Sequence, residues 1–330
     1  MSDDSETPAP RSRRRQILAL SCLTGLLGWM VVWGYLHRDD FQQLLSFHPR
    51  SIIEQLPLAV ISIVLIGMLN YVAARGLKAR IGLAEWVRVS LAANLANYIF
   101  PFRAGMFLRA AYLRRIHGLP VAQFGSITGA ISVLMLLIAA FVGMLVIMTR
   151  PAEMTQSTLT FSIVFCSTFA GSVVFWGLSI CPKRQSDSKL IPKSVRVFAI
   201  GLARLGRSKD ILFRLIAVGI CLLAVSSVRL FLSYSAIGWD IAPLDCAIVA
   251  CVLAMSIVVA ITPAGLGIQE AIGVAGSTLI GVPPEAGLAA LLVNRGVSMV
   301  VASTLGPFAL SGISRRLKMK SGLMSQDFSG

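Results

Sequence analysis

The sequence predicts an all-α, polytopic helical membrane protein with about six full spans and two re-entrant hairpins of broken helix. Two observations lead to this fold class. Of the 330 residues, 56% are hydrophobic and only 14% are charged, whereas soluble chains average about 25% charged residues. The mean hydropathy is +0.78, and several apolar runs are long enough to cross a bilayer. A soluble enzyme, a disulfide-rich secreted protein and a disordered chain are therefore excluded.

The charge balance is strongly basic, with 30 Lys and Arg residues against 15 Asp and Glu residues, a net charge of +15. In a membrane protein such an excess marks cytoplasmic loops beside anionic lipid. The basic residues flank apolar segments and form no binding motif, so we expect no nucleic-acid partner. The six cysteines form no CxxC pair, and no metal-ligand spacing is present. We therefore expect no metal and no cofactor.

The first spans follow from the apolar runs. Residues 1–16 form a basic tail that leads into a predicted span at 17–36, which is too long for the core of a signal peptide. The second predicted span covers 55–74, and Arg75 begins the basic stretch at its end.

The segment 81–117 is too polar for two ordinary spans and too apolar for a loop. Basic residues lie at both of its ends, which places both ends on the same side of the membrane. We therefore expect a re-entrant hairpin with a helix at 83–99, a break around Pro101 and a helix at 106–117. Backbone breaks at membrane depth are tolerated only where protein or a wet cavity shields them.

The rest of the chain continues this pattern. Spans are expected at 121–148, 158–181, 211–236 and 285–312, with a second broken segment at 243–281 and basic stretches at 182–210 and 313–330. The chain is then one membrane domain, 17–312, with related halves at 55–148 and 211–312. Nearly all basic residues outside the spans fall on one side. This predicts a multi-pass protein of the inner (cytoplasmic) membrane with both termini in the cytoplasm.

The two broken segments repeat one pattern. The first has Pro101 and Gly105 followed by Gly-Leu-Pro at 118–120, and the second has Pro263 and Gly267 followed by Gly-Val-Pro at 281–283. In the expected topology the first hairpin enters from the inside and the second from the outside. Matching Pro/Gly breaks in two halves of opposite orientation are typical of the substrate site of a transporter.

Polar residues inside apolar segments usually face a cavity or pair with one another. A broken helix exposes amide groups at the start of its second half, and arginine offers a planar fork that suits phosphate oxygens. Glycine lets a head group approach the backbone closely. The candidate head-group residues are Asn94, Asn97, Arg103, Gly105, Arg109, Gly265, Gly267, Glu270 and Arg295.

Structural explanations for these polar residues stay open at this point. Glu270 can complement the positive end of its own helix or pair with Arg295. Arg229 can reach the outer interface. Arg103 and Arg109 can be ordinary loop charges if the hairpin is shallow.

Residues 94–120 and 262–306 resemble the two motifs of the lysylphosphatidylglycerol synthase transmembrane-region family, a flippase-like membrane domain. The second motif is the more specific, with Thr-Pro-Ala-Gly-Leu-Gly-Ile-Gln-Glu at 262–270. Met106 stands where the family usually has an acidic residue, and Ala264 where it usually has glycine. The resemblance implies movement of a lipid, or of a polar group on a lipid, between leaflets. Only 18 residues follow position 312, so we expect the soluble aminoacyltransferase domain of full-length synthases to be absent.

These observations favour a lipid flippase or lipid transporter that moves an anionic or zwitterionic head group through a polar groove between two broken helices. Membrane lipids would be its ligands, and a lipid-modifying enzyme is a candidate partner. No Walker A motif, other nucleotide site or catalytic motif is visible in the sequence, so we expect a protein that is not an enzyme. The alternatives are an integral-membrane glycosyl- or aminoacyltransferase, an accessory subunit of a lipid-modifying enzyme, and a small-solute permease.

Overall fold

A computed structural model describes residues 48–77, 81–99, 104–149, 156–180, 200, 203–256 and 267–326. This part of the chain is helical and contains no strand, as predicted. The helices are α3 (Pro49–Gly76), α4 (Leu83–Ile99), α5 (Ala104–His117), α6 (Val121–Met148), α7 (Gln156–Ile180), α9 (Lys209–Ala236), α10 (Pro243–Met255), α11 (Ile268–Leu279) and α12 (Pro284–Gln326).

Five helices within the described ranges, namely α3, α6, α7, α9 and α12, are long and apolar enough to cross a membrane. They coincide with five of the six predicted spans, and the chain is a multi-pass membrane protein. The sixth predicted span, 17–36, lies outside the described residues. Large apolar side chains on the outside of the bundle, such as Phe213 and Phe308, suit contact with lipid.

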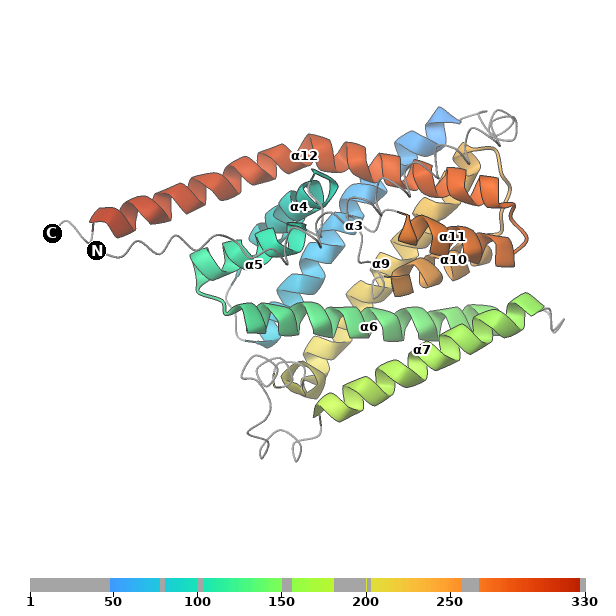
Figure 1. Ribbon diagram of the computed structural model, residues 1–330, viewed down its shortest axis with the longest axis horizontal. Coiled ribbons are helices and arrows are strands. Elements are labelled where there is room, and N and C mark those ends of the chain that lie inside the picture. Colours follow the sequence, from blue (N-terminus) through green and yellow to red (C-terminus); the bar gives the residue numbers. More distant parts are fainter. Residues whose placement is uncertain are drawn as a thin grey trace, which may run out of the picture.

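The four remaining helices are too short to cross. They have 17, 14, 13 and 12 residues in α4, α5, α10 and α11. At 1.5 Å per residue these lengths correspond to about 18–26 Å, less than the hydrocarbon thickness of about 30 Å. In Figure 1, α4 and α5 lie toward one end of the bundle, and α10 and α11 lie toward the other.

Both short pairs fold back on themselves. In the first pair, Tyr112 near the end of α5 donates a hydrogen bond of 2.6 Å to Glu85 at the start of α4. In the second pair, Cys246 at the start of α10 and Ile280 just after α11 belong to one apolar cluster with Tyr234. The entry and exit of each pair therefore lie together, as the two predicted hairpins require.

The two halves of the molecule run in opposite directions. The backbone amide of His48, just before α3, donates a hydrogen bond of 2.9 Å to the carbonyl of Ala236 at the end of α9. At the other end of the same pair, Gly76 of α3 lies against Leu205 and Ile211. Helices α3 and α9 are thus antiparallel neighbours, as the equivalent first helices of an inverted repeat must be.

Helix contacts follow the same exchange of halves. Helix α4 packs against α12 and α10 packs against α6, while α3 packs against α6 and α9 against α12. In the repeat, α3 corresponds to α9, α4 to α10 and α6 to α12. Exchanging the members of these pairs turns the α4–α12 contact into the α10–α6 contact, and the α3–α6 contact into the α9–α12 contact. Each hairpin is therefore held between its own half and the last helix of the opposite half.

Matching glycine turns join each hairpin to the long helix that follows. Gly118 and Gly281 have φ angles of 65° and 88°, in the left-handed region that favours glycine. After them, the amides of Leu119 and Val282 donate to the carbonyls of Leu113 and Ser277, at 3.3 and 3.0 Å. The proline of each turn, Pro120 or Pro283, then immediately precedes the next helix, so a glycine ends one helix and a proline leads into the next. The repeated Gly-x-Pro pattern in the sequence thus corresponds to a repeated turn.

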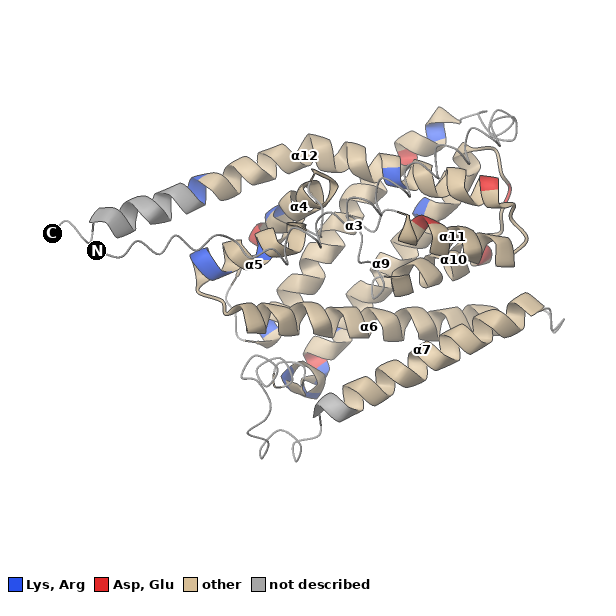
Figure 2. Cartoon of the chain, in the orientation of Figure 1, with Lys and Arg blue, Asp and Glu red and all other residues tan. Residues whose placement is uncertain are grey.

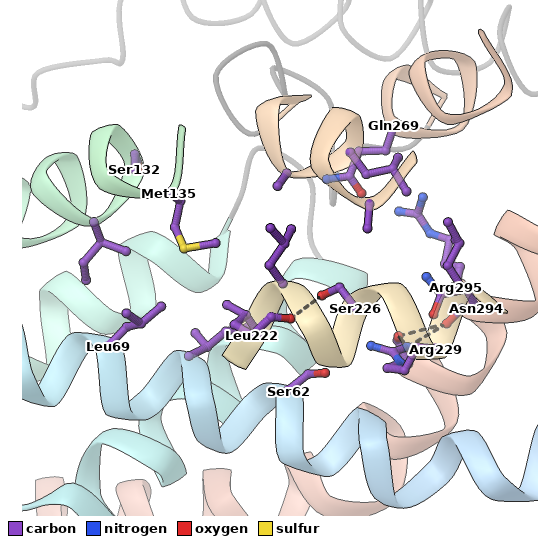
Figure 3. Close-up of a pocket in the computed structure, with 18 of the residues that line it drawn as sticks. Ser62, Leu69, Ser132, Met135, Leu222, Ser226, Arg229, Gln269, Asn294 and Arg295 are labelled. Atoms are coloured by element: carbon purple, nitrogen blue, oxygen red, sulfur yellow. Dashed lines mark hydrogen bonds between the residues drawn. The ribbon is translucent and has the colours of Figure 1, made fainter. Parts of the chain in front are cut away.

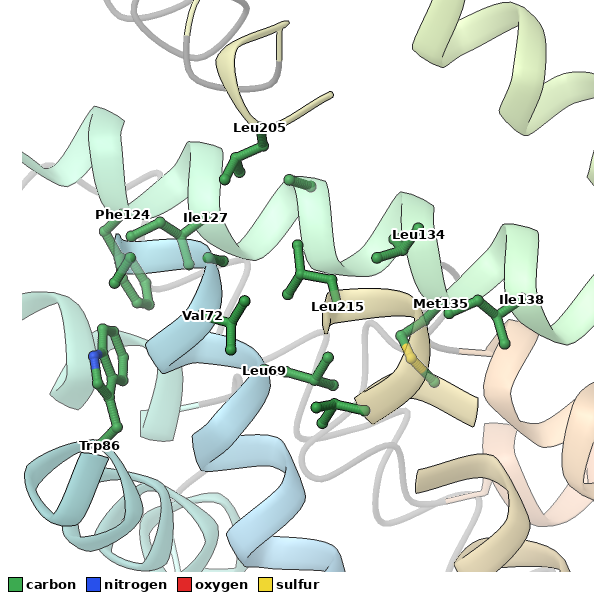
Figure 4. Close-up of a cluster of buried hydrophobic side chains, with 14 of the residues drawn as sticks. Leu69, Val72, Trp86, Phe124, Ile127, Leu134, Met135, Ile138, Leu205 and Leu215 are labelled. Atoms are coloured by element: carbon green, nitrogen blue, oxygen red, sulfur yellow. The ribbon is translucent and has the colours of Figure 1, made fainter. Parts of the chain in front are cut away.

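An apolar core joins α3, α4, α6 and α9. Figure 4 shows Val72, Trp86, Ile127 and Leu215 converging from these four helices. Trp86 and Ile127 are fully buried. This core lies at the end of the bundle where α3 ends and α9 begins.

Candidate functional site

The break in the first hairpin is built around Gly105. A Cβ at this position would lie 2.0 Å from the carbonyl oxygen of Ala93, so α4 and α5 approach each other too closely for any other residue. The backbone amide of Gly105 donates a hydrogen bond of 2.9 Å to Oδ1 of Asn97. The start of α5 is therefore bonded to the end of α4.

The break in the second hairpin has the same design with different residues. Gly267 has a φ of 81°, a conformation that L side chains rarely adopt. Its amide donates a hydrogen bond of 2.7 Å to Oε2 of Glu270, in the first turn of α11. Oε1 of the same carboxylate accepts a charge-assisted hydrogen bond from Nη1 of Arg295 on α12. Glu270 thus caps its own helix and also pairs with Arg295, which are the two structural explanations that the sequence left open.

These contacts give the glycines of the breaks a structural role. The sequence reasoning expected them to let a lipid head group approach the backbone closely. Both Gly105 and Gly267 instead donate their amide hydrogens to side chains of the protein. The two glycines shape the hairpins, and their own amides are already bonded within the protein.

A cavity of about 480 Å³ lies between the two hairpins and the long helices around them. It takes residues from α3, α4, α5 and α6 of the first half and from α9, α10, α11 and α12 of the second. Its polar lining consists of Ser62, Asn70, Tyr98, Arg109, Thr128, Ser132, Ser226, Arg229, Gln269, Glu270, Asn294, Arg295 and Ser298.

The charged side chains gather at one end of the cavity, while the opposite end combines apolar side chains with neutral polar ones such as Ser132. Figure 3 shows Arg229, Asn294 and Arg295 together at one end. Leu69 and Met135 lie at the opposite end in the same view. Such a division suits a ligand that has a charged group joined to an apolar one.

Arg229 is held in place from the last helix. It is 9% exposed, and its Nη2 donates to the carbonyl of Asn294 at 3.0 Å and to Oγ of Ser298 at 2.5 Å. Both acceptors are neutral, so these bonds orient the guanidinium without cancelling its charge. The alternative that Arg229 reaches the outer interface is wrong, because its side chain points into the cavity.

Further polar atoms at the site have unused hydrogen-bonding capacity. Among the described residues, Nε of Arg109, Nε of Arg229 and Oδ1 of Asn294 are buried and have no hydrogen-bond partner. Such groups are costly inside a membrane protein unless something pairs with them. The cavity can therefore bind a group that both accepts hydrogen bonds from arginine and donates one to an amide oxygen.

The predicted site residues divide into three groups. Arg109, Glu270 and Arg295 line the cavity, whereas Asn97, Gly105 and Gly267 build the hairpin breaks. Asn94 is half-buried in α4 and is not part of the described cavity lining. Arg103 and Gly265 lie outside the described residues, as do the prolines of both breaks.

The prediction did not include several polar residues of the long helices among the site residues. Arg229 and Asn294 line the cavity and each has a buried polar atom without a hydrogen-bond partner among the described residues, and Asn70 of α3 and Tyr98 of α4 also line it. Asn70 and Asn294 are amides within otherwise apolar spans, and that was the available signal.

A second polar cluster closes the open end of the first hairpin, away from the cavity. The carboxylate of Glu85 interacts with Tyr112, with Nε2 of His117 at 2.8 Å and with Nη1 of Arg316 at 3.1 Å. Burial raises the pKa of Glu85, but these donors outweigh it and leave the pKa below the ordinary 4.5. The cluster ties the start of α4 and the end of α5 to α12.

Metal chemistry has no support in the described part of the chain. No group of three or more His, Cys, Asp or Glu side chains lies there in an arrangement that could hold a metal ion. The described cysteines, Cys166, Cys221, Cys246 and Cys251, are free thiols.

The fold and the cavity define a multi-pass helical membrane protein whose two broken-helix hairpins meet at a charged internal cavity. The chain belongs to the family described as the lysylphosphatidylglycerol synthase TM region, whose model matches residues 16–306. This family is membrane-associated and lipid-related. No curated protein sequence matches the chain.

Proposed function

We propose that the protein moves a lipid with an anionic or zwitterionic head group between the two leaflets of the membrane. The observation that carries the proposal is the cavity, in which helices of both inverted halves place Arg109, Arg229 and Arg295 within the bundle. Arginine at this depth is costly unless it serves a ligand or a partner. The head group would enter the cavity while the acyl tails stay in the bilayer.

The inverted arrangement supplies a route from one side to the other. Hairpin α4–α5 opens toward the membrane face where α3 ends, and hairpin α10–α11 opens toward the opposite face. Rocking of one half against the other about the antiparallel pair α3 and α9 would expose the cavity to each face in turn. Because the halves are related by symmetry, the two exposed states can have similar free energies.

We further propose that the face carrying the end of α5 is cytoplasmic, in the inner membrane. The last turn of α5 contains Arg114, Arg115 and His117, and the end of α12 and the start of α9 on the same face are also basic. Figure 2 shows basic residues at these helix ends. Basic residues that flank spans favour the cytoplasmic side. Both termini would then be cytoplasmic.

We propose transport rather than a transferase reaction. A transferase that uses a lipid acceptor needs a carboxylate or another base free to act on the head group. The carboxylate that lines the described cavity belongs to Glu270, and it is already bonded to Gly267 and Arg295. Lipid transport needs no such base.

The test is transport of fluorescent phospholipid by the purified protein in liposomes, with a variant that fills the cavity. Ser226 lines the cavity on α9, so Ser226→Phe should reduce the transport rate to that of empty vesicles. Ser167→Phe on α7 is the matched control, because Ser167 is exposed on the outside of the bundle and also bonds a backbone carbonyl of its own helix. It should keep the wild-type rate. Wild-type protein no faster than empty vesicles, or Ser226→Phe as fast as wild type, would refute the proposal.

A further inference from the structure

The formal charges of the cavity do not balance. Three arginines, Arg109, Arg229 and Arg295, line the described cavity with one carboxylate, that of Glu270. Arg295 pairs with that carboxylate, so a surplus of two positive charges remains. The segments 17–36, 100–103 and 257–266 lie outside the described residues, and their sequences contain no Asp or Glu and one basic residue, Arg103.

This surplus points to the charge of the ligand. Burying a charge without a counter-charge in a low-dielectric site is strongly unfavourable. Arg229 is nearly fully buried and bonds only neutral acceptors, and Nε of Arg109 is buried without a partner among the described residues. A ligand with two negative charges would neutralise both arginines.

The amide of Asn294 adds an independent requirement. Its Oδ1 atom is buried and accepts no hydrogen bond from any described residue. An acceptor left unpaired in such a site costs about 1–3 kcal/mol. This acceptor requires a donor from the bound lipid or from a water molecule that enters with it. The charge count separates the head groups, because a phosphodiester brings one negative charge whereas a phosphomonoester dianion brings two.

We infer that the transported lipid carries a terminal phosphomonoester as its head group. Such a group has a charge of about −1.5 to −2 at pH 7, which matches the surplus of the cavity, and guanidinium groups bind phosphate oxygens in a bidentate fashion. The inference rests on the proposed transport function and narrows its ligand. The apolar side chains at the other end of the cavity, including Leu69 and Met135, would contact the part of the lipid next to the phosphate.

The same charge count argues against an aminoacylated lipid. A lysyl ester of phosphatidylglycerol brings one negative phosphate and two positive ammonium groups. Its ammonium groups would enter a cavity with surplus positive charge, in which the carboxylate of Glu270 is already paired. Repulsion between these ammonium groups and the surplus arginines disfavours such a complex.

The test is binding of soluble short-chain lipids to the purified protein. The probes are dihexanoyl phosphatidic acid (a phosphomonoester), dihexanoyl phosphatidylglycerol (a phosphodiester), a short-chain lysyl-phosphatidylglycerol and inorganic phosphate. We expect phosphatidic acid to bind at least about tenfold more tightly than each of the others. Phosphatidylglycerol or lysyl-phosphatidylglycerol binding as tightly as phosphatidic acid would overturn the phosphomonoester assignment. Inorganic phosphate that binds as tightly as phosphatidic acid would overturn the assignment to a lipid.

Variants of α5 connect this preference to the cavity. Arg109→Met removes one surplus charge and should reduce the preference for phosphatidic acid over phosphatidylglycerol about tenfold, whereas Arg109→Lys should retain it. Arg114→Met is the matched control, because Arg114 is an exposed arginine of the same helix outside the cavity lining. Its preference should equal that of the wild type. A preference unchanged in Arg109→Met, or lost equally in Arg114→Met, would overturn the inference.

Transport measured with the same head groups separates this inference from the proposed function. Phosphatidic acid crossing faster than phosphatidylglycerol supports both. Phosphatidylglycerol or its lysyl ester crossing as fast as phosphatidic acid overturns the head-group assignment and leaves lipid transport standing. If no lipid crosses faster than in empty vesicles, lipid transport itself fails, whatever the binding experiment gives.

Discussion

The close approach of α4 and α5 makes Gly105→Ala the most informative stability variant. The added methyl group would lie 2.0 Å from the carbonyl oxygen of Ala93 and 2.7 Å from Oδ1 of Asn97, whereas ordinary contact begins at 3.4 Å. Because the nearest atom is backbone, the helices must move apart by about 1.4 Å. This displacement also lengthens the hydrogen bond of 2.9 Å between the Gly105 amide and Asn97. Overpacking of this kind costs about 1–3 kcal/mol.

Thermal unfolding of the detergent-solubilised protein measures this effect. We expect Gly105→Ala to lower the unfolding midpoint by several degrees and to slow lipid transport, since the tip of the first hairpin shifts. Gly171→Ala is the control, because a Cβ added at Gly171 of α7 would have no heavy atom within 4 Å. Its midpoint should stay the same or rise, as expected for alanine in a helix. Equal midpoints for the two variants would show that the hairpin does not pack as described.

Two further predictions concern single polar contacts. Tyr234→Phe removes the buried bond of 2.6 Å between the tyrosine hydroxyl and Ser277 and should cost about 1 kcal/mol of stability. Tyr71→Phe should cost much less, because the bond from Arg75 to Tyr71 is exposed, and equal losses would contradict this. Glu85 has a lowered pKa in the folded protein, so the stability it contributes is present above pH 4.5 and is lost as the pH falls through the folded-state pKa. Melting curves from pH 3 to 7 should therefore give the wild type a higher unfolding midpoint than Glu85→Gln above about pH 5, and the two midpoints should converge in acid. A difference in midpoint that stays constant across this pH range would contradict the linkage.

Much of the fold could be predicted because the bilayer constrains it so strongly. Apolar runs of sufficient length predicted five spans. The pattern of Pro, Gly and basic residues predicted a helix at 83–99, which are the bounds of α4 in the structure. Boundaries set by local chemistry were less accurate. Helix α3 begins at Pro49 rather than 55, since proline is favoured at the first position of a helix, and α12 continues to Gln326 rather than ending at 312.

The site was harder to predict because its chemistry depends on contacts between distant residues. Sequence reasoning identified Gly105 and Gly267 as positions where a head group could approach the backbone, but it did not identify the bonds that their amides make. Only the fold shows that Asn97, eight positions earlier, bonds the first amide. Likewise Arg229 lies near the end of an apolar span, where snorkelling is common. Its packing against α12 turns it into the cavity instead.

The central claim is that the two inverted halves enclose a positively charged cavity that a polar ligand can enter. The most direct measurement is the modification rate of single cysteines on a cysteine-free background, with anionic and cationic methanethiosulfonate reagents. Ser226→Cys faces the cavity, and Val228→Cys, two positions further along α9, faces outward and is 48% exposed toward lipid. We predict that Ser226→Cys reacts at least about tenfold faster with the anionic reagent than with the cationic one, while Val228→Cys reacts slowly with both. Equal rates for the two reagents at Ser226→Cys, or no reaction there at all, would contradict the account.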